Sequence, residues 1–260
     1  MPKHCTNLKM RSIEKLESAA QLLLKSKSTI AFTGAGISVE SGIPTFRGIG
    51  GIWNNYSPRL LDINYFYRFP KKTWPVIIEL FYDFFEDKTP NQAHLTLSAW
   101  ESRHMLDGII TQNIDHLHQS AGSKKVYDFH GNAHFLICRK CGWKGEKTAE
   151  ILAQIPPECC RCGALLKPDF VFFGENIAPD VYEMSVEAVA KCDVLLIIGT
   201  SGEVSPANQL PHLAKQNGAK IIEVNPETSF FSQSITDIFL QGKATECLLE
   251  LNKLLHLNHQ

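Results

Sequence analysis

A chain of 260 residues, 44% hydrophobic and 20% charged, can bury a substantial core as one large domain or as one domain with a smaller insert. Its formal net charge of -1 excludes a globally basic surface, so we expect no direct nucleic-acid binding. No apolar run reaches the ~20 residues that span a bilayer, and residues 1–5 lack the apolar core of a signal peptide, so we expect no membrane partner.

The chain opens with a helix pattern followed by a strand pattern. Apolar residues in the stretch 13–26 fall on one helical face, and residues 29–32 form a short β-type run. The run leads into Gly34-Ala35-Gly36-Ile37-Ser38. A strand, a Gly-x-Gly turn and a following helix are typical of a Rossmann unit, because two glycines let the backbone approach a pyrophosphate. Val39 stands where the full fingerprint has a third glycine, so an ordinary tight turn stays open as an alternative.

The next segment, residues 40–53, is a glycine-rich loop that carries Phe46 and Arg47. Such a loop can fold over a ligand, with Phe46 excluding water and Arg47 pairing with a phosphate, or it can be a surface loop with one buried aromatic. Residues 54–90 are rich in aromatic side chains, which we expect to pack in the helices of a small second lobe. Asn91 marks the start of a further helix.

Four apolar strand candidates end in polar residues or glycine. The residues at these ends are Gln112-Asn113-Ile114-Asp115 after Gly108–Thr111, His130-Gly131 after residues 126–129, Gly199-Thr200-Ser201 after Val194–Ile198, and Asn225 after residues 220–224. Because α/β sheets bind ligands at the carboxyl ends of their strands, these residues are candidate ligand contacts. The alternation of strands with helical patterns, one of them from about Ala207 to Gly218, favours a doubly wound sheet.

Two cysteine pairs, Cys138-x-x-Cys141 and Cys159-x-x-Cys162, are separated by 17 residues, as in paired zinc knuckles. Four thiolates would close a tetrahedral shell, which predicts a structural zinc ion with no open position for catalysis. Cys160 breaks the two-residue spacing to Cys162, so we interpret it as a spare thiol. Eight cysteines, four of them in a metal pattern, favour a reducing compartment, and we expect a cytoplasmic protein. Lys3, Lys9, Arg11 and Lys15 leave a transit peptide open as an alternative.

Apolar side chains alternate through residues 168–175, directly after the cysteine module. Such a segment can pair with an extended peptide by β-addition if its backbone is exposed. It is therefore a candidate for contact with a polypeptide substrate.

Taken together, these motifs resemble one family, the sirtuins, which are NAD-dependent protein lysine deacylases. The matching motifs, in the family's order, are Gly34-Ala35-Gly36-Ile37-Ser38, Gly42-Ile43-Pro44-Thr45-Phe46-Arg47, Thr111-Gln112-Asn113-Ile114-Asp115, His130-Gly131, Phe172-Phe173-Gly174-Glu175 and Gly199-Thr200-Ser201. The resemblance covers roughly residues 28 to 245 and places the cysteine pairs in the family's zinc module. It implies an α/β fold: a Rossmann-like doubly wound parallel sheet with a smaller zinc-binding and helical lobe.

By this resemblance, residues 1–260 form one catalytic domain with the active site between two lobes. The large lobe comprises approximately residues 13–53, 91–134 and 176–255, and the small lobe approximately residues 54–90, which are helical, and 135–170, the zinc module.

The resemblance also implies the site residues. NAD would contact Gly34, Ala35, Gly36, Ser38, Thr45, Phe46, Arg47, Trp53, Gln112, Asn113, Ile114, Asp115, His130, Gly199, Thr200, Ser201, Asn225 and Ala244. The acylated lysine of a protein or peptide would contact Tyr82, Phe85, Val171, Phe172, Phe173 and Gly174. Zinc would be held by Cys138, Cys141, Cys159 and Cys162.

His130 and Asn113 are the catalytic residues that the resemblance implies. The amide oxygen of the acyl-lysine would attack the ribose C1′ as nicotinamide leaves, and alignment and exclusion of water would assist this poor nucleophile. His130, neutral near its reference pKa of ~6.5, would act as general base on the ribose hydroxyls. The products would be free lysine, nicotinamide and O-acyl-ADP-ribose.

The acyl preference depends on two positions. Enzymes of the family that remove succinyl, malonyl or glutaryl groups have a Tyr-x-x-Arg pair, and this chain has Tyr82 with Phe85 in the arginine position. A buried carboxylate would then lack a partner, at a cost of several kcal/mol. We therefore expect deacetylation, extending to longer apolar acyl groups, with desuccinylation or demalonylation as an alternative if Arg68, Lys71 or Lys72 reaches the pocket.

Three other functions compete with this interpretation. Transfer of ADP-ribose to a protein uses the same NAD cleavage. A non-catalytic zinc-containing binding module would leave Asn113, Asp115 and His130 without a purpose. An oxidoreductase is disfavoured because Val39 breaks the dinucleotide fingerprint. The oligomeric state and the protein substrates are not readable from the chain.

Overall fold

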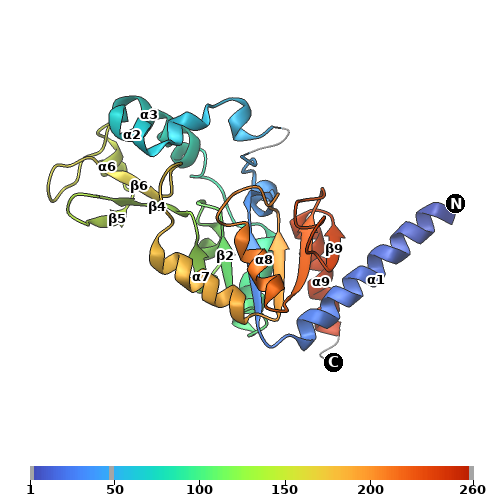
Figure 1. Cartoon of the computed structure of the whole chain (residues 1–260). Coiled ribbons are helices and arrows are strands. Elements are labelled where there is room, and N and C mark those ends of the chain that lie inside the picture. Colours follow the sequence, from blue (N-terminus) through green and yellow to red (C-terminus); the bar gives the residue numbers. More distant parts are fainter. Residues whose placement is uncertain (1–2, 47–49, 258–260) are drawn as a thin grey trace.

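A six-stranded parallel sheet, the large sheet, forms the centre of the larger lobe (Figure 1). The structure, a computed structural model, describes residues 3–46 and 50–257, with side chains for residues 12–46 and 50–256. The strands lie in the order β3-β2-β1-β7-β8-β9. Their bounds are β1 Thr29–Thr33, β2 Gly108–Thr111, β3 Val126–Asp128, β7 Val194–Ile198, β8 Lys220–Asn225 and β9 Ile238–Gln241. The order runs outward in both directions from β1 and β7, so the topological switch point, where such sheets bind ligands, lies between these two strands.

Helices cover both faces of the large sheet and explain why its strands are continuously apolar. One face packs against α1 (Lys3–Lys25), α4 (Gln92–Ser102) and α9 (Ala244–Leu257) through a core that includes Leu23, Trp100 and Leu248. The other face packs against α7 (Pro179–Lys191) and α8 (Gln209–Gln216), with Phe32 and Ile197 in its core. Every residue of β1, β2 and β7 is buried. The doubly wound sheet predicted from the sequence is confirmed.

The small lobe combines short helices with a three-stranded antiparallel sheet, the small sheet, in the order β5-β4-β6. Its strands are β4 Gly131–Ile137, β5 Lys144–Glu146 and β6 Lys167–Phe170. Its helices are η3 Pro58–Leu61, α2 Ile63–Arg68, α3 Pro70–Ile77, the π-helix η4 Ile78–Asp83 and α6 Ala149–Leu152. An aromatic core joins them, in which Phe66, Trp74, Phe81 and Phe172 are each at most 1% exposed. Figure 1 shows α2, α3 and α6 gathered on the side of the molecule away from α1 and α9.

The chain crosses from the large sheet to the small sheet within two residues. Strand β3 ends at Asp128 and β4 begins at Gly131, which leaves Phe129 and His130 at the junction. Gly131 has φ +74°, and a Cβ there would lie 2.2 Å from the carbonyl oxygen of Asp169, so only glycine allows this close passage. The candidate catalytic histidine is therefore fixed between the two lobes by the path of the chain.

Several predicted elements differ from the structure in extent or type. Helix α1 begins at Lys3, well before residue 13, and the helix predicted at the Gly-x-Gly turn is a 3₁₀ helix, η1 Ala35–Ser41. Asn91 caps α4 with a capping box, as its position predicted. Helix α7 and strand β9 were not anticipated, and the short elements η2 Ile52–Asn54 and α5 Leu117–Ser120 complete the fold. In the part of the chain that the structure describes, no helix is long and apolar enough to cross a membrane.

Candidate active site and metal centre

Two glycine turns touch backbone to backbone at the switch point. The N–H of Gly34 donates to the carbonyl of Ile198 at 3.0 Å, and that of Gly36 donates to Gly199 at 2.8 Å. A Cβ on Gly36 would lie 2.6 Å from the Cα of Gly199, and one on Gly34 would lie 2.7 Å from the Cβ of Thr200. Side chains are absent here because there is no room for them. The two turns form a shallow backbone cradle of the kind that lets a dinucleotide approach closely.

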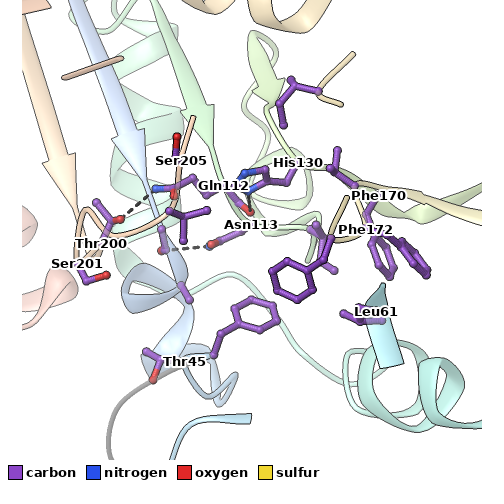
Figure 2. Close-up of a pocket in the computed structure, with 18 of the residues that line it drawn as sticks. Thr45, Leu61, Gln112, Asn113, His130, Phe170, Phe172, Thr200, Ser201 and Ser205 are labelled. Atoms are coloured by element: carbon purple, nitrogen blue, oxygen red, sulfur yellow. Dashed lines mark hydrogen bonds between the residues drawn. The ribbon is translucent and has the colours of Figure 1, made fainter. Parts of the chain in front are cut away.

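A cavity of about 380 Å³ extends from this cradle into the space between the lobes (Figure 2). It runs past Gln112, Asn113 and His130 to an apolar end formed by residues that include Leu61 and Phe81. Thirteen predicted NAD contacts line it: Gly34, Ala35, Gly36, Thr45, Phe46, Trp53, Gln112, Asn113, Ile114, His130, Gly199, Thr200 and Ser201. Arg47 lies outside the described residues. The cavity therefore joins a nucleotide cradle to an apolar pocket, with the histidine between them.

Four predicted NAD contacts do not line the cavity, and two of them lie directly beneath it. The hydroxyl of Ser38 donates to Asp115 at 2.6 Å, and the Nδ2 of Asn113 donates to Ser38 at 3.1 Å and to the carbonyl of Gly34 at 3.3 Å. Burial raises the pKa of Asp115, and the hydrogen bond from Ser38 acts in the opposite direction. Ser38 and Asp115 thus orient the amide of Asn113 from below.

The other two, Asn225 and Ala244, lie further from the cavity. Asn225 donates to the carbonyl of Thr200 at 3.1 Å and to Glu223 at 2.8 Å, so it supports the turn that follows β7. Ala244, the first residue of α9, packs into the core on one face of the large sheet. Asn225 reaches the cavity only through the backbone of Thr200.

His130 is held in one orientation by a backbone carbonyl. Its Nδ1 lies 3.1 Å from the carbonyl oxygen of Gln112. Because a carbonyl only accepts hydrogen bonds, Nδ1 carries the proton and Nε2 keeps its lone pair. Burial lowers the pKa of His130, and the hydrogen bond to Gln112 acts in the opposite direction. The ring is therefore neutral near pH 7 and can accept a proton at Nε2.

Residues 170–174 all line the cavity, and their side chains alternate in exposure. Phe173 is 45% exposed and Val171 is half-buried, whereas Phe170 and Phe172 are buried and stack on each other at 5.0 Å between centroids. The N–H of Val171 donates to the carbonyl of His130 at 2.8 Å. The backbone of Phe173 bonds to Leu61 at 2.8 Å and to Ile63 at 3.0 Å, so part of the edge predicted for peptide pairing is already used.

The two residues predicted to sense the acyl group stand apart from the cavity. Tyr82 is 2% exposed, lies in the small-lobe core and does not line the cavity, and neither does Phe85. Phe81 lines it instead, with Phe85 packed against it at 5.8 Å and Phe170 at 5.2 Å between centroids. Phe81 and Tyr82 lie in the π-helix η4, and Phe85 follows it in the chain.

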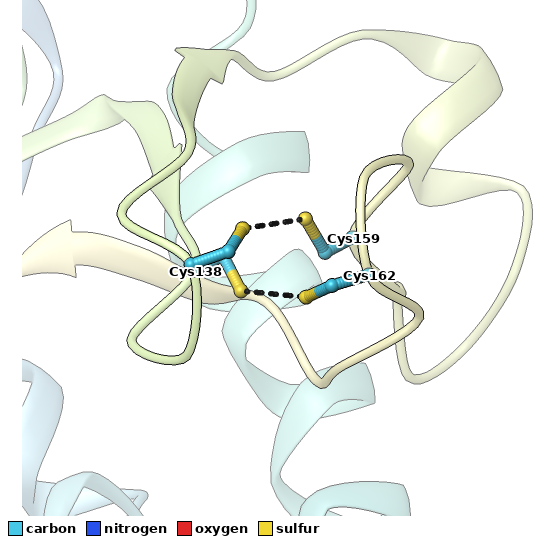
Figure 3. Close-up of side chains that lie close together, drawn as sticks. Cys138, Cys159 and Cys162 are labelled. Carbon is cyan, nitrogen blue, oxygen red and sulfur yellow. Dashed lines mark hydrogen bonds between the residues drawn. The ribbon is translucent and has the colours of Figure 1, made fainter.

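The four predicted cysteines converge on one point (Figure 3). All four sulfurs lie within 4.8 Å of one another, and Cys138–Cys162 and Cys141–Cys159 are each 3.6 Å apart. Zinc–sulfur bonds of ~2.3 Å in a tetrahedron place the sulfurs ~3.8 Å apart, so the cluster fits a structural zinc ion. Cys160 is exposed and lies outside the cluster, as expected from its spacing.

Each cysteine pair sits on a tight turn of the same construction. The N–H of Gly142 donates to the carbonyl of Cys138 at 2.9 Å, and that of Gly163 donates to Cys159 at 2.8 Å. The two glycines have φ +73° and +70°, a left-handed conformation that favours glycine. Two matched knuckles therefore present the thiolates to a single ion.

The chain is similar to a known family, to a relative and to two solved structures. A model of the Sir2 family matches residues 34–206. An NAD-dependent protein deacylase of Pyrococcus abyssi is 42% identical over 239 residues, covering 88% of this chain and 93% of the relative. A crystal structure of a Sir2 homolog–NAD complex has a TM-score of 0.87 at 38% identity, covering 94% of this chain and 95% of that one. A Sir2–p53 peptide–NAD⁺ structure has a TM-score of 0.82 at 33% identity, with 90% and 95% covered.

Proposed function

The chain belongs to the Sir2 family, and from that premise we propose that its cavity is the active site of an NAD-dependent protein lysine deacylase. One observation carries the proposal: His130 lies on the cavity wall between the glycine cradle and the apolar end. A histidine in that place can act on a nucleotide from one side and on an acylated lysine from the other.

The residues around the cradle fit NAD. The turns at Gly34 and Gly199 line the cavity and would hold the phosphates, and Gln112, whose Nε2 donates to the hydroxyl of Thr200 at 3.0 Å, lines the same cavity. When bound, NAD supplies a ribose carbon from which nicotinamide can depart. Asn113 is oriented by Ser38 and by the carbonyl of Gly34, and it would fix the position of the part of NAD next to it. The gain comes from alignment and from the exclusion of water.

His130 performs the proton transfer. Its Nδ1 proton stays with the carbonyl of Gln112, while Nε2 accepts a proton from a hydroxyl group held in the cavity. The carbonyl of His130 also accepts the N–H of Val171, so the residue that transfers the proton is tied to the segment that contacts the acyl-lysine. Zinc stays out of this chemistry, because four cysteines close its coordination shell.

The apolar end of the cavity sets the acyl class. Of the residues that line it in the described part of the chain, none is Lys or Arg, and Leu61, Phe81 and Phe170 form its walls. The carboxylate of a succinyl or malonyl group would be buried without a cation, at a cost of several kcal/mol. We therefore propose acetyl-lysine and lysines with longer apolar acyl groups as the substrates.

A peptide panel with NAD tests the proposal. We expect mass spectrometry to show loss of the acetyl group and of longer apolar acyl groups, release of nicotinamide, and no turnover of succinyl-lysine. His130→Ala should fold and lose nearly all turnover, whereas His256→Ala, at an exposed position on α9, should keep it. A gain in target mass equal to ADP-ribose would instead indicate ADP-ribosyl transfer, and efficient desuccinylation would contradict the acyl assignment.

We also propose a cytoplasmic location. The cysteines whose side chains the structure describes form no disulfide, and four of them suit a metal, which is the pattern of a reducing compartment. Fractionation of the native cells with an antibody against the chain would test this location.

A further inference from the structure

A buried ion pair lies behind the segment that contacts the acyl-lysine. Lys167, on β6, has a side chain 2% exposed, and its Nζ lies 2.9 Å from the Oε2 of Glu175, whose side chain is 7% exposed. These two residues bracket the stretch that presents Val171 and Phe173 to the cavity. Neither charge has a part in the chemistry proposed above.

The ammonium of Lys167 uses all three of its donors within this one segment. Besides Glu175, it donates to the carbonyl of Pro168 at 2.9 Å and to that of Phe170 at 2.5 Å. It also lies 4.4 Å from the centroid of the Phe172 ring, in cation–π contact. An ammonium has three hydrogens, so none is left for another partner. Lys167 thus ties both ends of residues 168–175 to one point.

Glu175 connects the same point to the zinc module. Its Oε2 also accepts the N–H of Phe172 at 2.8 Å, and its Oε1 pairs with the guanidinium of Arg139. Arg139 follows Cys138 in the first knuckle and is 58% exposed. One carboxylate therefore links the metal knuckle, strand β6 and the backbone of the substrate segment.

A buried ion pair is a poor means of stabilising a fold. Removing two charges from water costs about as much as their attraction returns, and apolar residues of similar volume do as well or better. In some proteins such a pair fixes a particular conformation. Here the conformation that it fixes is the turn of residues 168–175, from which the N–H of Val171 reaches the carbonyl of His130 at 2.8 Å.

We propose that Lys167 is a positioning residue for the acyl-lysine: through Glu175 and two backbone carbonyls it holds the segment carrying Val171 and Phe173 against His130. This inference rests on the proposed function, because it gives Val171 and Phe173 the role of substrate contacts. Without Lys167, the turn of residues 168–175 loosens, the walls of the acyl-lysine entrance spread, and the NAD cradle on the other lobe stays intact.

Lys167→Met tests the proposal by removing the charge at nearly constant volume. We expect the KM for an acetyl-peptide to rise by roughly ten-fold or more, since small misplacements of contact residues are costly. The KM for NAD should stay within about two-fold, because the cradle lies on the large lobe, and the zinc content should not change. Lys167→Arg, which keeps a buried cation, should recover part of the loss.

Lys144→Met is the matched control. Lys144 is also a lysine of the small sheet in an ion pair, at 2.6 Å from Asp169, but its side chain is 56% exposed. A surface pair is worth little, so this variant should keep the wild-type KM for the peptide. Equal rises in both KM values for Lys167→Met, or no rise in either, would overturn the positioning role.

Binding of a fluorescein-labelled acetyl-peptide, read by polarisation with ADP-ribose present, separates this inference from the proposed function. If wild type binds the peptide in this assay but does not turn it over when NAD replaces ADP-ribose, the result would count against the deacylase activity. Weaker binding by Lys167→Met would still support positioning. If Lys167→Met does not fold, Glu175→Gln takes its place, since its amide oxygen can still accept the N–H of Phe172. Unchanged peptide binding by a folded Glu175→Gln would overturn the inference.

Discussion

The two sheets of this molecule are stabilised in different ways. The large sheet is covered by helices on both faces, and its central strands are buried throughout. The small sheet has three short strands, and in β5 two residues of three are exposed. The large lobe draws on the burial of apolar surface, whereas the small lobe adds four metal-binding thiolates and the Lys167–Glu175 pair. The division suits the chemistry. His130 is anchored to the large sheet, which apolar burial stabilises, and the acyl-lysine contacts belong to the small lobe, which adds the metal-binding thiolates and the ion pair.

Loss of zinc should break the small lobe and spare the large one, and we expect this to be the largest effect. Cys141→Ser removes one ligand, and structural zinc contributes on the order of 10 kcal/mol to the folding of such modules. Turnover should fall below detection. Hydrogen exchange should show lost protection in β4–β6 and retained protection in β1 and β7.

Cys160→Ser is the control for this prediction. Cys160 neighbours the ligand Cys159 but is exposed and outside the cluster, so zinc content and turnover should match wild type. Uniform loss of protection in both sheets after Cys141→Ser would show that the lobes fold as one unit, contrary to the comparison.

Gly36→Ala should do the converse and damage the large lobe at its switch point. The added Cβ would lie 2.6 Å from the Cα of Gly199, so the two turns of the cradle must separate. We expect a loss of about 1–3 kcal/mol of unfolding free energy, as for other overpacked sites, and a rise in the KM for NAD. Steady-state kinetics with either substrate varied would detect the asymmetry. A rise confined to the peptide KM would contradict the assignment of the cradle to NAD.

Local patterns were sufficient to predict five of the six strands of the large sheet and the zinc cluster, but not β9. Val194–Ile198 is apolar without interruption because both of its faces are covered, and the cysteine pairs carry their spacing in the chain itself. The polar strand ends predicted the cavity wall at Asn113 and His130, because parallel strands end at one edge of the sheet.

Contacts that depend on long-range packing could not be predicted in this way. The pairing of Arg139 with Glu175 joins residues far apart in sequence, on turns whose geometry depends on the folded knuckle. Tyr82 is the residue implied by resemblance to the family's Tyr-x-x-Arg pair, whereas Phe81 lines the cavity; which of these adjacent side chains does so depends on how η4 packs in the small lobe. The sequence therefore predicts what a strand end or a metal spacing determines, and misses what two distant segments determine together.

Phe81→Leu should change the acyl preference by a smaller amount. Phe81 lines the apolar end, so a shorter side chain lengthens the pocket, and turnover of octanoyl-lysine relative to acetyl-lysine should rise several-fold. Tyr82→Phe is the control, because its buried hydroxyl has no hydrogen-bond partner among the described residues and its ring does not line the cavity. A larger change from Tyr82→Phe than from Phe81→Leu, measured by competition between the two peptides, would return the acyl-sensing role to Tyr82.

Acid should destabilise the large lobe instead of the small one, because the large lobe contains buried histidines. His94, on α4, is 0% exposed, and its ring packs edge-on to that of His118 at 4.9 Å between centroids. Burial lowers the pKa of His94 to about 4. The unfolded chain, with a histidine pKa of ~6.5, takes up the proton first, so the stability that neutral His94 confers is complete above pH 6.5 and is lost as the pH falls towards 4.

At ~1.36 kcal/mol for each unit of pKa difference, we expect wild type to lose about 2 kcal/mol through His94 between pH 7.5 and pH 5. His94→Gln cannot titrate there, so its deficit in unfolding free energy relative to wild type should shrink by that amount. Using the difference between the two proteins cancels groups that do not interact with His94, such as Asp128, whose pKa burial raises; His118, whose pKa burial and the charge of His94 lower, contributes to the same difference. Urea unfolding at the two pH values measures it. A constant deficit would mean that His94 is hydrated in the folded protein.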